Sequence, residues 1–228
     1  MDSNPGSQPG QSSAAIQLSL GQMPGFSGDL SRIEGWTMPG TEAVSRVMIP
    51  VEAPDGRYVA WSELLGRPVV GGDRWSRLAL ESPGLDEGGP PYGFVDSRTA
   101  SRMVSVLAQV TSPADPVVVA ISRIYCDDVP DIGPGAQPPG GEYTFLSWEQ
   151  ADLFLCPDLW VLTKMTRENN CHFPVALWTL GLTWSLAAPL YSDSWFFSGP
   201  RVIHEALIDS GLESLPVSRS DRSPAEGD

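Results

Sequence analysis

Three carboxylates stand close together just after a predicted buried strand. Asp127, Asp128 and Asp131 follow Cys126 and open a stretch rich in Gly and Pro. Carboxylate oxygens are the ligands that Ca²⁺ and Mg²⁺ prefer, and a pair of carboxylates can act as acid and base in a hydrolase. The complete calcium-loop pattern, with Asp or Asn at alternate positions and a closing Glu, is missing here. A divalent-metal hydrolase, a partner-binding surface and solvated loop charge therefore all stay open.

Thiols and imidazoles offer a second kind of chemistry. Cys171 and His172 are adjacent, but neighbours in a strand point to opposite faces, so they cannot face each other as a catalytic pair. A pairing of Cys171 with His204 is geometrically open. Zinc sites need three or four Cys or His ligands, usually with a close-spaced pair, and Cys126 and Cys156 add no such pair. We expect buried reduced thiols, no metal centre and no cofactor.

Motifs for phosphate binding and acyl transfer are absent from the sequence. The chain contains no GxxxxGK[ST] or GxGxxG loop and no GxSxG nucleophile elbow. No catalytic residue is therefore assigned, and we favour a protein that is not an enzyme.

Aromatic side chains are the other unusual feature, since the chain has eight tryptophans. Aromatic rings dominate both cores and binding hot spots, and we expect most of these in the core. The run Trp195, Phe196 and Phe197 differs, because a strand should not point all three rings inward. One or two of them should lie at a surface, at a partner site or under a loop. The candidate partner-binding residues are therefore Trp195 and Phe197 together with Asp127, Asp128 and Asp131.

Charge and composition exclude several classes of protein. The chain of 228 residues has 14 Lys+Arg against 28 Asp+Glu, a net charge of −14, which excludes a general nucleic-acid binder because phosphate contacts need clustered cations. Its 23 Gly and 22 Pro have no fixed period, which excludes collagen. The acidity is concentrated, since residues 113–217 carry thirteen acidic and four basic side chains. A partner-binding face should lie in that half.

Periodicity and breaker residues predict the elements that position these groups. A helix capped by Asp96 or Ser97 should run to about Val110, and a second should run from Ser198 or Gly199 to Ser210, with Gly211 beyond its end. A capping-box pattern of Ser147 and Gln150 predicts a helix to about residue 155. We expect strands at residues 43–50, 58–65 (turning into a short helix), 117–125, 143–146, 159–162, 182–187 and 194–197.

These elements indicate one α+β domain at residues 36–217, with a mixed or mainly antiparallel sheet and two or three helices. Residues 1–35 form a predicted flexible leader rich in Pro, Gly and Ser, in which residues 16–20 could form an edge strand. Residues 218–228 form a predicted disordered acidic tail. The uncharged stretch 171–192 is long enough to cross a membrane, but its prolines and polar residues favour buried strands. No secretory signal is visible, so we expect a cytoplasmic protein.

Short segments in the C-terminal half carry a family resemblance. They are residues 184–191 (WSLAAPLY), 194–200 (SWFFSGP), 207–209 (LID) and 212–217 (LESLPV). With residues 106–124, 142–147 and 157–160, they resemble a family of uncharacterised actinobacterial proteins. In that family a Glu-Ile-Asp segment stands where this chain has Pro189-Leu190-Tyr191. This chain therefore lacks both carboxylates of that segment. The resemblance implies a shared fold and an actinobacterial setting, and it implies no activity.

We expect a soluble, non-catalytic protein-binding module, of the immunity or antitoxin type, whose acidic face binds a basic protein. Acidic surfaces steer towards basic partners and can cover their nucleic-acid sites. The alternative is a metal-dependent hydrolase that uses Asp127, Asp128 and Asp131. A third hypothesis is a scaffold component that acts through its Pro-rich leader. No membrane or nucleic-acid partner is expected, and the oligomeric state stays open.

Overall fold

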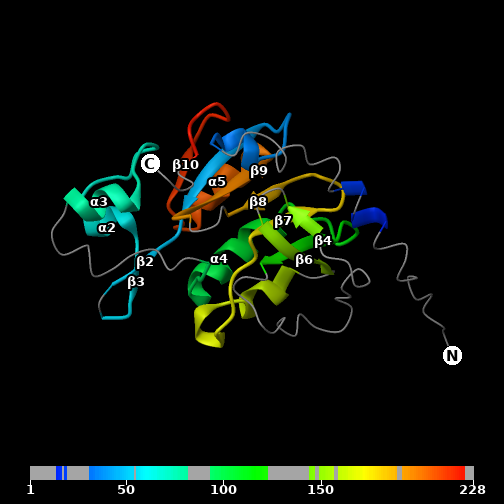
Figure 1. The fold of residues 1–228 in the computed structure, drawn as a ribbon, viewed down its shortest axis with the longest axis horizontal. Coiled ribbons are helices and arrows are strands. Elements are labelled where there is room, and N and C mark those ends of the chain that lie inside the picture. The colour runs from blue at the N-terminus through cyan, green and yellow to red at the C-terminus, as the bar shows by residue number, and fades with distance from the viewer. Residues whose placement is uncertain are drawn as a thin grey trace.

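An antiparallel sheet of eight strands forms the centre of the molecule (Figure 1). The computed structural model describes residues 14–16, 18–19, 31–53, 55–81, 93–122, 144–146, 149–156, 159–188 and 192–223. The strand order is β10-β1-β9-β8-β7-β4-β6-β5, and every neighbouring pair is antiparallel. The strands are β1 (Ala43–Met48), β4 (Val117–Ser122), β5 (Thr144–Leu146), β6 (Glu149–Cys156), β7 (Ala176–Thr179), β8 (Ser185–Ala187), β9 (Ser194–Gly199) and β10 (Ser214–Pro216). The predicted α+β class with an antiparallel sheet is confirmed.

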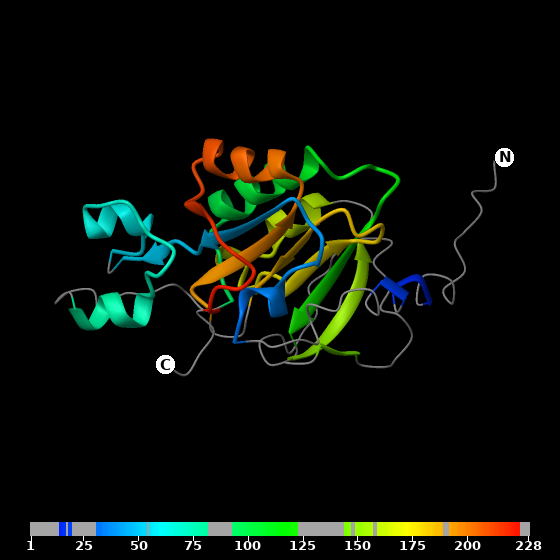
Figure 2. The same cartoon turned by 90° about the horizontal axis from the view of Figure 1, so that it is seen from above.

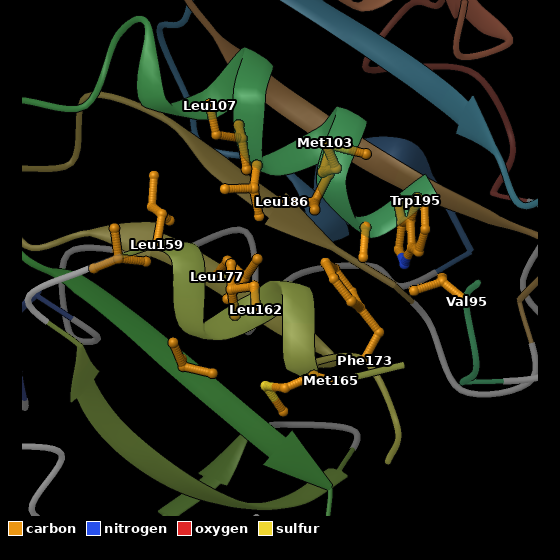
Figure 3. Close-up of a cluster of buried hydrophobic side chains, with 14 of the residues drawn as sticks. Val95, Met103, Leu107, Leu159, Leu162, Met165, Phe173, Leu177, Leu186 and Trp195 are labelled. Atoms are coloured by element: carbon orange, nitrogen blue, oxygen red, sulfur yellow. The ribbon is translucent and has the colours of Figure 1, made fainter. Parts of the chain in front are cut away.

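Two helices and a 3₁₀ segment cover one face of this sheet (Figure 2). They are α4 (Ser97–Ala108), α5 (Arg201–Asp209) and η3 (Leu159–Lys164). Asp96 caps α4 by accepting from the backbone N–H groups of Arg98 and Thr99, each at 3.0 Å. The main core fills the space between these elements and the strands (Figure 3), with side chains such as Met103, Leu107, Leu162, Leu177 and Trp195.

The opposite face of the sheet is covered as well. Ile33, Trp36 and Met38, from η2 (Ile33–Trp36) and the residues after it, pack with Ile16 on the strand side chains Val118, Ala120, Trp178 and Phe196. Every residue of β4 is therefore buried, as its continuous apolar sequence predicted.

A side lobe, formed by residues 51–53 and 55–81, extends from the end of β1 (Figures 1 and 2). It contains β2 (Val51–Glu52), β3 (Tyr58–Val59), α2 (Trp61–Leu65) and α3 (Trp75–Glu81). Trp61 and Trp75 meet edge to face, with ring centroids 5.4 Å apart. Together with Val59, Leu78 and Met48 of β1, these rings give the lobe a small core of its own.

Three element predictions are corrected by the structure. Residues 149–156 form β6 rather than a helix, because they pair with β4 from Ala151 to Cys156. Residues 159–164 form the 3₁₀ segment η3 rather than a strand, and the buried Leu159, Leu162 and Met165 recur at the three-residue period of that helix. Strand β7 lies in the uncharged stretch 171–192 and was not predicted separately. That stretch does form strands, as expected, and the helices of the described residues include none that is long and apolar enough to span a membrane.

Residues 31–34 and residues 219–223 run side by side. Ile33 and Glu34 donate backbone hydrogen bonds to Asp221 and Arg219, and Ser223 donates to Ser31. The predicted loose tail is therefore wrong for residues 218–223, whereas residues 224–228 lie outside the described residues. Packing also begins before the predicted boundary at residue 36, because Ile16 and Ile33 are buried. Ile16 lies in a helical turn and not in an edge strand.

Candidate functional site

The aromatic residues that were predicted to contact a partner are buried. Trp195 and Phe197 are 2% and 0% exposed and belong to the main core under α4 and α5. Phe196 points to the other face and packs in the cluster that contains Trp36. All three rings are buried because both faces of the sheet are covered, so the assignment of Trp195 and Phe197 as partner-binding residues is wrong.

The predicted acidic cluster cannot be placed in the same way. Asp127, Asp128 and Asp131 lie outside the described residues. Within the described part of the chain, no group of three or more His, Cys, Asp or Glu side chains could hold a metal ion.

Several other acids of the C-terminal half hold elements together. Asp115 accepts from the backbone N–H of Gly181 at 2.7 Å, and Glu168 accepts from the backbone N–H of Ser97 at the start of α4. Asp193 pairs with Arg46, and Glu213 accepts from the first N–H groups of α2. Burial alone would raise the pKa of the Glu168 carboxyl. The hydrogen bond from the backbone N–H of Ser97 and its other hydrogen bonds outweigh this, so the pKa is lowered.

The two imidazoles contact other side chains, and the Cys156 thiol is buried. His204 lies on α5, and its Nδ1 is 2.6 Å from the hydroxyl of Ser45, which is fully buried and cannot serve as a nucleophile for an external substrate. This bond fastens α5 to β1. His172 packs on the ring of Phe94, and burial lowers its pKa to about 4. Burial also raises the pKa of Cys156 to about 12, so its thiol is unreactive.

The most connected buried group is Arg46 of β1, which no sequence pattern had singled out. Its guanidinium donates to the carbonyls of Gly71 and Asp73 at 3.0 and 2.6 Å, to the Ser194 hydroxyl at 2.7 Å and to the Asp193 carboxylate at 2.9 Å. The second oxygen of Asp193 accepts from the backbone N–H of Trp75. These partners come from the side lobe and from the start of β9, so this network anchors the side lobe to the sheet.

The neighbouring carboxyl of Asp73 completes this anchor. Arg67 donates two hydrogen bonds to it, at 2.8 and 3.0 Å, and holds its pKa below the usual range. The backbone N–H of Val70 donates to the same carboxylate at 2.9 Å. These contacts close the loop between α2 and α3 into a fixed shape.

An unpartnered surface remains on the outer side of the helices. Val202 and Ile208 of α5 are 57% and 49% exposed, and Glu205 and Asp209 are exposed beside them. At 100° per residue these four side chains span about a third of the helix circumference, opposite the buried Ile203 and Leu207. The core contacts only the side of α5 that carries Ile203 and Leu207, so Val202 stays exposed.

A groove runs along this surface between α5 and α4. It has a volume of about 540 Å³, and its walls include Arg98, Ser101, Arg102, Ser105, Ala206 and Asp209. The exposed arc of α5 and this groove together are called the helical face below. It carries Glu205 and Asp209 together with the exposed Arg201 on the α5 side, and Arg98 and Arg102 on the α4 side. A partner laid across it therefore meets both signs of charge.

Comparison with known proteins gives no further guide, since no family model, curated protein or solved structure matches this chain.

Proposed function

We propose that this protein is a binding module for another protein, and that the helical face makes the contact. The observation that carries the proposal is the exposure of Val202 and Ile208 beside Glu205 and Asp209 on one side of α5. Apolar side chains that share a face with charged ones are typical of surfaces that bind an amphipathic helix. Neither acid has a hydrogen bond or ion pair within the described part of the chain.

Charge indicates what kind of partner would fit. An approaching segment with Lys or Arg near its apolar side chains would pair with Glu205 and Asp209 as Val202 and Ile208 become covered. The protein's charge of −14 would speed the encounter with such a segment. Immunity proteins and antitoxins that cover a basic surface work in this way, and we place the protein in that functional class.

A cross-linking experiment tests this proposal. A photoreactive amino acid at position 205 should capture one stoichiometric partner in native lysate, and capture should fall as salt is raised. The double variants Val202→Ser/Ile208→Ser and Glu205→Gln/Asp209→Asn should each weaken binding of the isolated partner by about tenfold or more.

Val70→Ser is the matched control, because Val70 is equally exposed but lies on the side lobe. It should bind the partner as the unchanged protein does. A partner that binds both double variants normally, or the absence of any stoichiometric partner, would contradict the proposal.

A further inference from the structure

A second hollow lies between the side lobe and the start of α4. It has a volume of about 170 Å³ and is lined by β1, by the β3–α2 segment, by α4 and by the turn that follows α5. A cavity of this size can hold several water molecules or one small organic molecule. We call it the lobe cavity.

Two opposite charges line this cavity without pairing with each other. Arg98 belongs to α4 and Glu63 to α2, and neither side chain has a hydrogen bond or ion pair within the described residues. Glu63 interacts electrostatically with Arg57, but the Arg57 guanidinium forms its salt bridge with Asp55. The second guanidinium at the cavity, that of Arg102, donates to the carbonyl of Gly211 at 3.2 Å. Arg98 and Glu63 are thus the cation and the carboxylate at the cavity whose side chains make no hydrogen bond within the described part of the chain.

The other carboxylates at the cavity are already occupied. Asp96 accepts from the N–H groups at the start of α4, and Glu213 accepts from Trp61 and Ser62 at 2.6 and 2.8 Å. The negative charges of these two acids are balanced by the partial positive charge of the helix N–H groups that they bind. They leave Glu63 and Arg98 as the groups that can take a charged ligand.

Polar and apolar wall atoms complete the cavity. Tyr58 lines the cavity, and burial raises the pKa of its hydroxyl while the nearby Arg167 guanidinium acts in the opposite direction. Met48, Val59 and Leu212 are buried and supply an apolar wall.

We propose that the lobe cavity binds a free α-amino acid with an apolar side chain. The planar guanidinium of Arg98 would take the carboxylate through two parallel hydrogen bonds, and Glu63 would take the ammonium group. The side chain would cover Met48 and Leu212. A molecule with only one of the two charges would leave either Arg98 or Glu63 unpaired. The lobe cavity is distinct from the exposed arc of α5 that carries the proposed function, although Arg98 borders both the cavity and the groove of the helical face.

Calorimetric titration of the full chain with three probes tests the inference. L-leucine carries both charges, 4-methylpentanoate lacks the ammonium group, and 3-methylbutylamine lacks the carboxylate. Leucine should bind at least about tenfold more tightly than either analogue, because each lost charged hydrogen bond weakens binding by that factor or more.

Two variants separate the two charges. Arg98→Gln should reduce leucine binding to the level of 3-methylbutylamine, and Glu63→Gln should reduce it to the level of 4-methylpentanoate. Neither change should lower the thermal midpoint without ligand, since both side chains are exposed and form no internal hydrogen bond. Arg201→Gln, at an exposed arginine on α5, is the matched control and should bind leucine normally.

Three results would overturn the inference. The first is no saturable heat at about 10 mM leucine, a concentration that fills most sites even when the Kd is about 1 mM. The second is equal binding of all three probes. The third is an equal loss of leucine binding in Arg201→Gln and Arg98→Gln.

Discussion

Arg46 illustrates how a charged residue can serve the fold from inside it. The residue is 1% exposed, and all three nitrogens of its guanidinium donate to the sheet or to the side lobe. Burying a charge is costly unless it is paired and hydrogen-bonded, and here the cation pairs with Asp193 and makes four hydrogen bonds in all. The cation also lies 5.9 Å from the centre of the Trp61 ring. Arg46 therefore specifies how the lobe sits on the sheet.

His172 makes stability depend on pH. Its pKa is about 4 in the folded protein, against 6.5 for an exposed histidine. Between pH 6.5 and about pH 4 the histidine is protonated in the unfolded chain and neutral in the folded protein. The free energy of unfolding therefore decreases as pH falls through this window. In His172→Gln this contribution should be absent. Urea unfolding at several pH values measures the difference.

The comparison between the two proteins isolates the histidine. Carboxylates that titrate in the same range contribute equally to both, so the free energy of unfolding of the unchanged protein minus that of His172→Gln should decline from pH 6.5 to 4. A difference that stays constant over this range would disprove the assignment. Titration of the imidazole by NMR should give a pKa near 4.

Individual residues also show where sequence reasoning succeeds. Asp96 was correctly expected to cap α4, and Gly211, which follows α5, has a φ of 78° as expected for a residue that ends a helix. Both roles depend on near neighbours in the chain. The roles of Asp193 and Glu213 depend on backbone groups more than 100 positions away, and no local pattern encodes them. In the sequence they were only two of the thirteen acids of residues 113–217.

At the scale of elements, long-range pairing decides the cases that local pattern leaves ambiguous. The capping-box pattern before residue 150 is a real helix indicator, yet β6 gains a full register of pairs with β4 on one side and β5 on the other. Strands β4 and β9 were predicted because their apolar residues are continuous and β-branched or aromatic. The helical face was not predicted, since exposure of Val202 depends on which side of α5 meets the sheet.

The attachment of α2 is testable through Glu213. Its carboxylate accepts from Trp61 and Ser62 at the first turn of the helix, and hydrogen bonds to a charged group contribute about 1.5–3 kcal/mol. Glu213→Ala should lower the free energy of unfolding by about that amount and speed amide exchange at both residues. Hydrogen exchange followed by NMR measures this.

Glu63→Ala is the matched control for this prediction. Glu63 lies on the same helix but makes no hydrogen bond within the described residues, so stability and exchange should stay unchanged. Equal exchange rates in Glu213→Ala and the unchanged protein would show that α2 is held by its apolar contacts alone.

At the scale of the whole molecule, the covering of the second sheet face depends on the C-terminal segment. Residues 218–223 bind the backbone of Ser31, Ile33 and Glu34 through three hydrogen bonds of 2.8–3.0 Å. A chain ending at Val217 loses these bonds, each contributing about 0.5–1.5 kcal/mol, so its free energy of unfolding should fall by about 1.5–4.5 kcal/mol. The urea midpoint measures this fall.

A chain ending at Ser223 is the matched control, because it keeps these bonds and should unfold at the same urea concentration as the full chain. Equal midpoints for both truncations would contradict the role of the segment.

The fold class was predictable because antiparallel strands and amphipathic helices leave clear periodic patterns. The covering of both sheet faces was harder to predict from the sequence, because it depends on a few apolar residues such as Ile16 and Ile33 within a polar, Gly-rich segment. The same covering explains why Trp195 and Phe197 were misassigned, since alternation exposes a ring only where one face of the sheet is open.

The position of β1 in the sheet sets the order in which the protein can be made. Residues 43–48 pair with residues 194–199 on one side and with residues 214–216 on the other. A ribosome releases the first of these segments long before the last, so β1 has neither neighbour until about 150 further residues have been made. Contacts of such large sequence separation slow folding, and unpaired strand edges favour aggregation during the delay.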